Sequence, residues 1–133
     1  MGTSLPFTPC TDDVQAWAVS SVTTEPDPPV TGQSFAIVLA GPLSITVSQG
    51  ANCVVTGKLG ETVVISLTAD LCAVAARQRQ PCPVSPRPDW MLSIPLDLGD
   101  VPPFVTLDLR LQATNGDGTP LTCLDTAVKL QPC

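Results

Sequence analysis

Hydrophobic and polar residues alternate with a period of two in three stretches of the chain. They are QSFAIVLA (33–40), ETVVISLT (61–68) and FVTLDLRLQA (104–113). Because successive side chains of a strand point to opposite faces, each stretch is predicted to be a half-buried β-strand. The apolar positions on the predicted inner faces are Phe35, Ile37, Leu39, Val63, Ile65, Leu67, Leu107, Leu109 and Leu111.

Four more short runs have strand-like composition: SITVS (44–48), CVVTG (53–57), WMLSIPL (90–96) and TAVKL (126–130). Turn-forming residues separate the runs at 41–42, 49–52, 58–60 and 115–118. Seven or eight short strands with turns between them are typical of an antiparallel β-sandwich, so the fold class is predicted to be all-β. DLCAVAARQRQ (70–80) alone has helix-favouring composition, with Asp70 as its cap; Pro81 and Pro83 limit it to one or two turns.

Length, charge and the length of the apolar runs restrict the domain organisation and the partners that we expect. A chain of 133 residues is expected to form one domain. Its net charge is −6 and its basic residues form no long stripe, so nucleic acid is not an expected partner. Its apolar runs reach about six residues, against the roughly 20 that a membrane-spanning helix needs. The start, Met1 to Ser4, lacks the features of a signal peptide, so we expect a mature secreted chain with an added initiator methionine.

Six cysteines suit an oxidising compartment, and their even number predicts a disulfide framework whose connectivity the spacing leaves open. Zinc is not expected, since the chain has no histidine and no closely spaced cysteine pair. Cys72 and Cys82 are too far apart for a thioredoxin-like redox site, which favours a structural bridge. NGDGT (115–119) lacks most of the ligands of a calcium loop and is interpreted as a tight turn.

Catalytic signatures are few. Without histidine there is no Ser-His or Cys-His pair, and the nucleophile, phosphate-loop and metalloprotease motifs are absent from the sequence. Acid–base chemistry would depend on carboxylates such as Asp97 with Asp100 or Asp12 with Asp13, which are interpreted as solvated charges. We therefore expect no enzyme activity, no cofactor and no metal. An enzyme that uses carboxylates alone is the weakest alternative.

The order of several features resembles the ML lipid-recognition domain family. EPDPPVTGQSFAIVLAG (25–41) is followed by D-L-C (70–72), C-P (82–83), I-P-L (94–96) and D-G-x-x-L-x-C (117–123). The family includes the Niemann-Pick type C lysosomal sterol carrier, mite group-two allergens and fungal phosphatidylglycerol/phosphatidylinositol transfer proteins. The resemblance implies a single domain over residues 5–133, with an immunoglobulin-like sandwich of two antiparallel sheets and a lipid cavity between them.

The resemblance also implies disulfides and a binding site. Cys10 would pair with Cys123 and Cys72 with Cys82, the latter fixing one rim of the cavity. Cys53 and Cys133 are additional to the family pattern and are left to pair with each other. The apolar positions named above become cavity-wall candidates, with Trp90 and Phe104 at the entrance. The loop closed by Cys72 and Cys82 looks longer than is usual for the family, and the glycine common after Cys-Pro is missing.

The predicted function is binding and transfer of a sterol or acyl lipid, with a sterol, fatty acid or phospholipid as ligand. The alternative is a secreted interaction or co-receptor module whose cavity is incidental, since a fold does not fix a function. The interpretation leaves room for transient membrane contact, and we expect a monomer that is secreted or lies in the lumen of an acidic, vacuolar or secretory compartment.

Overall fold

The computed structural model describes residues 5–10, 15–25, 34–97 and 105–129. Within these residues the chain forms eight strands and one short helix. In chain order they are β1 (Phe7–Pro9), β2 (Ser21–Glu25), β3 (Ser34–Leu43), β4 (Asn52–Leu59), β5 (Thr62–Asp70), α1 (Leu71–Arg77), β6 (Arg87–Asp97), β7 (Thr106–Thr114) and β8 (Pro120–Lys129).

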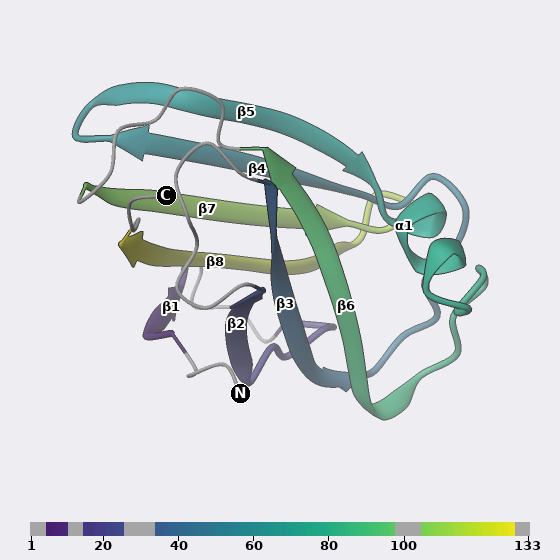
Figure 1. Cartoon of the computed structure of the whole chain (residues 1–133). Helices are drawn as coiled ribbons and strands as arrows, with labels where there is room; N and C mark the ends of the chain where they lie inside the picture. Colours follow the sequence, from purple (N-terminus) through teal and green to yellow (C-terminus); the bar gives the residue numbers. More distant parts are fainter. Residues whose placement is uncertain (1–4, 11–14, 26–33, 98–104, 130–133) are drawn as a thin grey trace.

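The strands form two antiparallel sheets. One has five strands in the order β1-β8-β7-β4-β5, and the other has three in the order β2-β3-β6. Figure 1 shows the strands of the small sheet crossing the face of the large one, with α1 where β5 leads to β6. This arrangement confirms the predicted all-β sandwich. It leaves β5 and β6 as edge strands of their sheets.

The core lies between the two inner faces. In β7 the alternation is complete: Leu107, Leu109 and Leu111 are at most 1% exposed, while the residues between them are exposed. Each fully buried leucine contributes about 2 kcal/mol of burial free energy, which pins the register of the strand. Buried residues from both sheets join one hydrophobic cluster.

Some predicted boundaries are wrong. Residues 44–48 form no strand: only Val47 makes an isolated bridge, with Val84. The backbone there is held instead by the Asn115 side chain, so ladder pairing is not needed. The predicted turn at 41–42 lies inside β3, where Gly41 allows the backbone of Ala18 to pass too close for any Cβ atom. The short strands β1 and β2 were not predicted.

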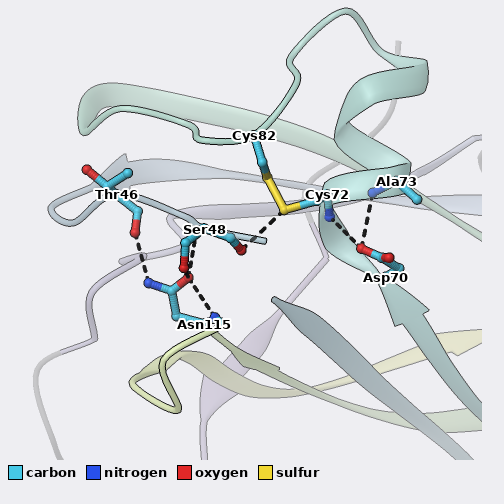
Figure 2. Close-up of a disulfide and its surroundings, with 8 residues drawn as sticks. Thr46, Ser48, Asp70, Cys72, Ala73, Cys82 and Asn115 are labelled. Carbon is cyan, nitrogen blue, oxygen red and sulfur yellow. Dashed lines mark hydrogen bonds between the residues drawn. A yellow bond between two sulfur atoms is a disulfide. The ribbon is translucent and has the colours of Figure 1, made fainter. Parts of the chain in front are cut away.

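Two local predictions are confirmed. Asp70 caps α1, because its Oδ1 accepts hydrogen bonds from the amides of Cys72 (3.0 Å) and Ala73 (3.2 Å), as Figure 2 shows. The segment after β7 is a tight turn, in which the Gly118 amide donates to the Asn115 carbonyl. In the part of the chain that the structure describes, no helix is long and apolar enough to cross a membrane.

Candidate functional site

The space between the sheets is lined by most of the predicted wall residues. Phe35, Ile37 and Leu39 lie on β3, and each is at most 3% exposed. From the large sheet the inner face adds Ile65, Leu67, Leu107, Leu109 and Leu111. The structure thus brings these eight side chains into one apolar cluster.

The prediction that Val63 lies on the inner face of its strand is wrong. The pairing of β4 with β5 shifts between Gly57, which pairs with Ile65, and Lys58, which pairs with Val63. Val64 is the extra residue of this bulge, so the alternation changes phase there. Val63 therefore shares the outward face of its partner Lys58 and is 52% exposed.

The two entrance candidates have different outcomes. Trp90 lies inside the core at 0% exposure, with its ring centroid 4.5 Å from that of Trp17. It therefore fills one end of the inter-sheet space and does not stand at a surface entrance. Phe104 falls outside the described residues.

The interior carries no formal charge. The buried polar or charged residues among those described are Thr24, Asn115, Thr122 and Thr126, with no Asp, Glu, Lys or Arg. Three buried polar atoms, Thr24 Oγ1, Trp17 Nε1 and Trp90 Nε1, find no hydrogen-bond partner in the described part of the chain. Sequence reasoning missed them, since periodicity does not reveal whether a buried hydroxyl or indole is satisfied. They are polar groups available inside an otherwise apolar space.

One side of the sandwich is fastened by the chain before β2, and we call it the N-terminal seam (residues 5–10 and 15–19 with their partners). The Trp17 amide donates to the Leu121 carbonyl of β8 (2.8 Å), and the Ala18 amide donates to Pro42 of β3 (2.9 Å). The Leu5 amide, two residues before β1, donates to the Val22 carbonyl of β2 (2.6 Å). Because these bonds reach strands of both sheets, the seam holds the sheets together.

The same seam carries a side-chain clamp and a disulfide. Gln15 donates through Nε2 to the Cys123 carbonyl (2.9 Å) and accepts from the Thr122 hydroxyl (2.5 Å). Cys10 and Cys123 form a disulfide, as the family resemblance implied. β1 is therefore held covalently to β8.

The opposite side, which we call the β5–β6 seam, is built differently. No backbone pairing joins β5 to β6 in the described residues, and both are sheet edges. Burial also decreases toward this side: Leu111 on β7 is 0% exposed, Ile65 on β5 is 7% exposed, and Leu67 is only partly buried. The inner face is thus least enclosed beside β5.

Among the described residues, side-chain hydrogen bonds fasten this seam at its α1 end. Gln78, at the end of α1, donates to the Ser93 carbonyl (2.7 Å) and accepts from the Ser93 amide (3.0 Å), like a short strand pairing with β6. Gln80 adds a bond to the Met91 carbonyl (3.1 Å). These bonds satisfy backbone groups at the edge of β6 near the helix, and they do not join β6 to β5.

The second predicted disulfide, Cys72–Cys82, closes the loop after α1. Figure 2 shows it beside Ser48, whose carbonyl oxygen lies 3.3 Å from Cys72 Sγ. Ser48 is in turn fixed by Asn115, whose Oδ1 accepts from the Ser48 amide (2.9 Å). Helix, loop and turn therefore form one braced corner at the end of the β5–β6 seam.

The expected Cys53–Cys133 bridge is opposed by the described geometry. Cys53 is buried and has no disulfide partner among the described residues; Cys133 lies outside them. Lys129 pairs with Thr106, seven residues along β7 from Ala113, the partner of Cys53. That separation is about 23 Å, whereas four extended residues span at most about 14 Å and a bridge adds about 7 Å between Cα atoms. Burial raises the pKa of the Cys53 thiol to about 12, which keeps it protonated.

Two surface hollows lie away from the inter-sheet space. One, of about 770 Å³, lies on the outer face of the large sheet between Thr56, Asp108, Arg110 and Asp125. There Arg110 Nε donates to Asp125 Oδ1 at 2.7 Å, and this pairing raises the pKa of the guanidinium. The other, of about 570 Å³, adjoins the Cys10–Cys123 bridge.

Known proteins are similar to most of this chain. A fungal phosphatidylglycerol/phosphatidylinositol transfer protein from Aspergillus oryzae is 30% identical over 80% of this chain and 60% of its own length. One of the same name from Cryptococcus neoformans is 29% identical over 86% of this chain and 63% of its own. The chain thus spans about three fifths of these relatives.

Two crystal structures share the architecture. A Niemann-Pick type C2 protein from the Japanese carpenter ant aligns with a TM-score of 0.66 and 13% identity, over 95% of this chain and 99% of that one. Chicken MD-1, complexed with lipid IVa, aligns with a TM-score of 0.52 and 17% identity, over 92% and 87%. At these identities the likeness establishes the immunoglobulin-like sandwich fold. The family model for the ML domain matches residues 4–130, and the chain therefore belongs to the ML domain family.

Proposed function

We propose that this chain binds a lipid between its two sheets and transfers it between membranes without changing it chemically. The observation that carries the proposal is the inner face of the described residues, which is aliphatic and uncharged, is fastened along one side of the sandwich and has no strand pairing between β5 and β6 along the other. The names of the curated relatives describe transfer proteins and support the same function. The wall would be the eight inner residues named above.

The β5–β6 seam is the proposed route for the lipid. Separating β5 from β6 breaks no backbone ladder, whereas parting the N-terminal seam breaks hydrogen bonds and a disulfide. The sheets would therefore part about the N-terminal seam, and an acyl chain or sterol would enter beside the partly buried Leu67.

Apolar area supplies the affinity. Covering about 300 Å² of hydrocarbon at roughly 25 cal/mol per Å² gives about 7 kcal/mol before the cost of parting the sheets. Micromolar binding needs about 8 kcal/mol, so moderate, exchangeable binding is the expected regime. Such affinity suits a carrier that must also release its ligand.

The ligand class is a sterol or an acyl lipid. An aliphatic wall discriminates weakly, so a fluorescent sterol and a fluorescent fatty acid should bind within about tenfold of each other. The unpartnered indole and hydroxyl groups of Trp17, Trp90 and Thr24 are the inner positions at which a ligand oxygen would find a hydrogen bond. A preference of more than about tenfold for one of the two ligands would implicate these groups in its recognition.

The two disulfides support an extracellular or lumenal site of action, since such bonds persist in oxidising compartments. We propose that the protein is secreted or lies in the lumen of a secretory, vacuolar or acidic compartment, where it works as a monomer.

The direct test is solvent extraction of the purified protein followed by mass spectrometry, and then titration of ligand-stripped protein with fluorescent lipids. Leu109→Trp, on the inner face, should abolish uptake and destabilise the stripped protein by about 1–3 kcal/mol. Val63→Trp, on the outer face of the bulge, is the matched control and should leave uptake unchanged. Absence of extracted lipid together with no uptake by the stripped wild type would favour the interaction module, with the Arg110–Asp125 hollow as the surface to examine.

A further inference from the structure

Basic residues are concentrated in one segment of this acidic chain. Residues 71–88 contain three of the six basic residues, Arg77, Arg79 and Arg87, and no Asp or Glu, although the whole chain has a net charge of −6. All three arginines are exposed. None takes part in an ion pair among the described residues, whereas Arg110 is bound to Asp125.

The fold places Arg77 and Arg79 at the end of α1 and in the turn after it, which bonds to β6, and Arg87 at the start of the same strand. Arg77 ends α1 and Arg79 follows in the turn, between the two glutamines that bond to the β6 backbone at Ser93 and Met91. Arg87 begins β6, about 13 Å along the strand from Met91. The Cys72–Cys82 bridge closes the loop between them. We call residues 77–80 with Arg87 and Met91 the basic corner.

Arg79 has a backbone conformation that favours glycine. Its φ is +62°, just after the last turn of α1, where left-handed geometry closes a helix. A residue with a Cβ atom adopts this conformation less readily than glycine, so Arg79 is a local departure from the residue that the backbone favours.

The surroundings indicate a lipid surface. Met91, on the strand that Gln80 contacts, is 55% exposed and adds an apolar side chain to the arginines. Two carboxylates lie near: Asp89 is exposed, while Asp70 is bonded to the first amides of α1. Arg77 ends α1 and Arg79 lies in the turn after it, and α1 lies where the chain passes from β5 to β6 (Figure 1).

We propose that the basic corner docks this protein on anionic phospholipid membranes and presents the β5–β6 seam to the bilayer. Guanidinium groups pair with lipid phosphates, and the exposed methionine enters the interface. The net negative charge of the rest of the chain is repelled from the same surface, so the attraction orients the molecule. The purpose of docking rests on the proposed lipid transfer, but the docking itself is measured separately.

The test is co-sedimentation with vesicles of phosphatidylcholine alone and of phosphatidylcholine with about 30% phosphatidylglycerol, which gives a negative surface. Wild type should bind the anionic vesicles only, and less so as salt is raised. Each arginine near such a surface contributes about fivefold, so Arg77→Gln/Arg79→Gln/Arg87→Gln should lose about a hundredfold in partitioning. The matched control Lys58→Gln/Arg110→Gln/Lys129→Gln removes the same charge and should lose less than about fivefold on the same scale.

A single substitution separates docking from folding. Arg79→Gly should raise the melting temperature, because glycine tolerates the left-handed backbone, while weakening binding to anionic vesicles about fivefold. Equal losses in the two triple variants, or unchanged vesicle binding by Arg79→Gly, would overturn the proposal.

Lipid loading distinguishes this inference from the proposed function. The triple variant of the basic corner should take up a fluorescent fatty acid from solution as wild type does, and only its transfer from anionic vesicles should slow. Vesicle binding that depends on the arginines in a protein that takes up no lipid would support docking and contradict lipid carriage.

Discussion

The N-terminal seam and the β5–β6 seam close opposite sides of the same sandwich by different means. The first uses backbone bonds that reach β2, β3 and β8, a glutamine clamp and a disulfide. The second has side-chain bonds at its α1 end and partly buried leucine beside an edge strand. This difference supports the proposed entry of lipid along the β5–β6 seam, because the N-terminal seam carries more of the bonds that would have to break for the sheets to part.

The largest expected effect comes from removing the covalent link of each seam. Cys10→Ala/Cys123→Ala, which opens a bridge of sequence separation 113, should lower the free energy of unfolding by about 5 kcal/mol. Cys72→Ala/Cys82→Ala, with separation 10, should lower it by about 3 kcal/mol. Urea unfolding of both variants measures the difference. Equal losses of unfolding free energy in the two variants would mean that the disulfide fastens the N-terminal seam no more strongly than the other bridge fastens the loop after α1.

Next in size is the burial difference across the large sheet. Leu111→Ala on β7 leaves a cavity in an enclosed site and should cost about 3 kcal/mol. Leu67→Ala, on the partly buried face of β5, should cost only about 1 kcal/mol. Chemical denaturation of the ligand-stripped proteins tests this pair. A larger loss at Leu67 would place the tightly packed side at β5.

The clip at the α1 end offers a sharper test of the opening. Gln78→Ala removes both bonds to Ser93 and should lower stability by about 1–2 kcal/mol while speeding the release of a fluorescent lipid. Gln112→Ala, an exposed glutamine on β7, is the control and should change neither. Release is measured by stopped-flow dilution. An unchanged rate of lipid release from Gln78→Ala would show that the Gln78–Ser93 hydrogen bonds do not control lipid exchange.

The smallest effect concerns the thiol inside the sandwich. Burial raises the pKa of the folded Cys53 thiol from its ordinary 9.0 to about 12, so its contribution to stability is fully present below pH 9 and is lost as the pH rises from 9 to 12. Compared with Cys53→Ala, wild type should therefore lose about 1 kcal/mol more between pH 7 and pH 10. At neutral pH an alkylating reagent should label Cys53 only as fast as the sheets part. Rapid labelling of folded, lipid-loaded protein would contradict its burial.

Sequence patterns predicted the sheets well and the seams poorly. The alternation of Leu107, Leu109 and Leu111 reflects burial on one face, a property that a strand carries along its own length. The phase change at Val63 depends on its pairing with Lys58, which no single-strand pattern contains. Nor does the sequence show that Trp17 contacts both β8 and β3, because those partners are distant in the chain.

The candidate site shows the same division. Composition and family likeness identified an aliphatic interior, whereas the unpartnered indole of Trp90 and the hydroxyl of Thr24 emerged only from the packing. Resemblance supplied two disulfides. The third expected pair involves Cys133, which lies outside the described residues, and strand register opposes it, since Cys53 and Lys129 lie toward opposite ends of the large sheet.

The N-terminal seam also has a consequence for the order of folding. Its contacts with β8 join residues that are far apart in the chain, such as Gln15 with Cys123, 108 positions apart, and Pro6 with Thr126, 120 positions apart, whereas Cys72 and Cys82 are 10 apart. Closing such long loops costs more chain entropy than closing local ones, so these contacts form late. β8, which supplies the partners of the seam, follows every other described strand in the chain. During synthesis the N-terminal seam is therefore completed last, and the nascent chain exposes the inner face of the large sheet, the proposed lipid-binding surface, until β8 has been made.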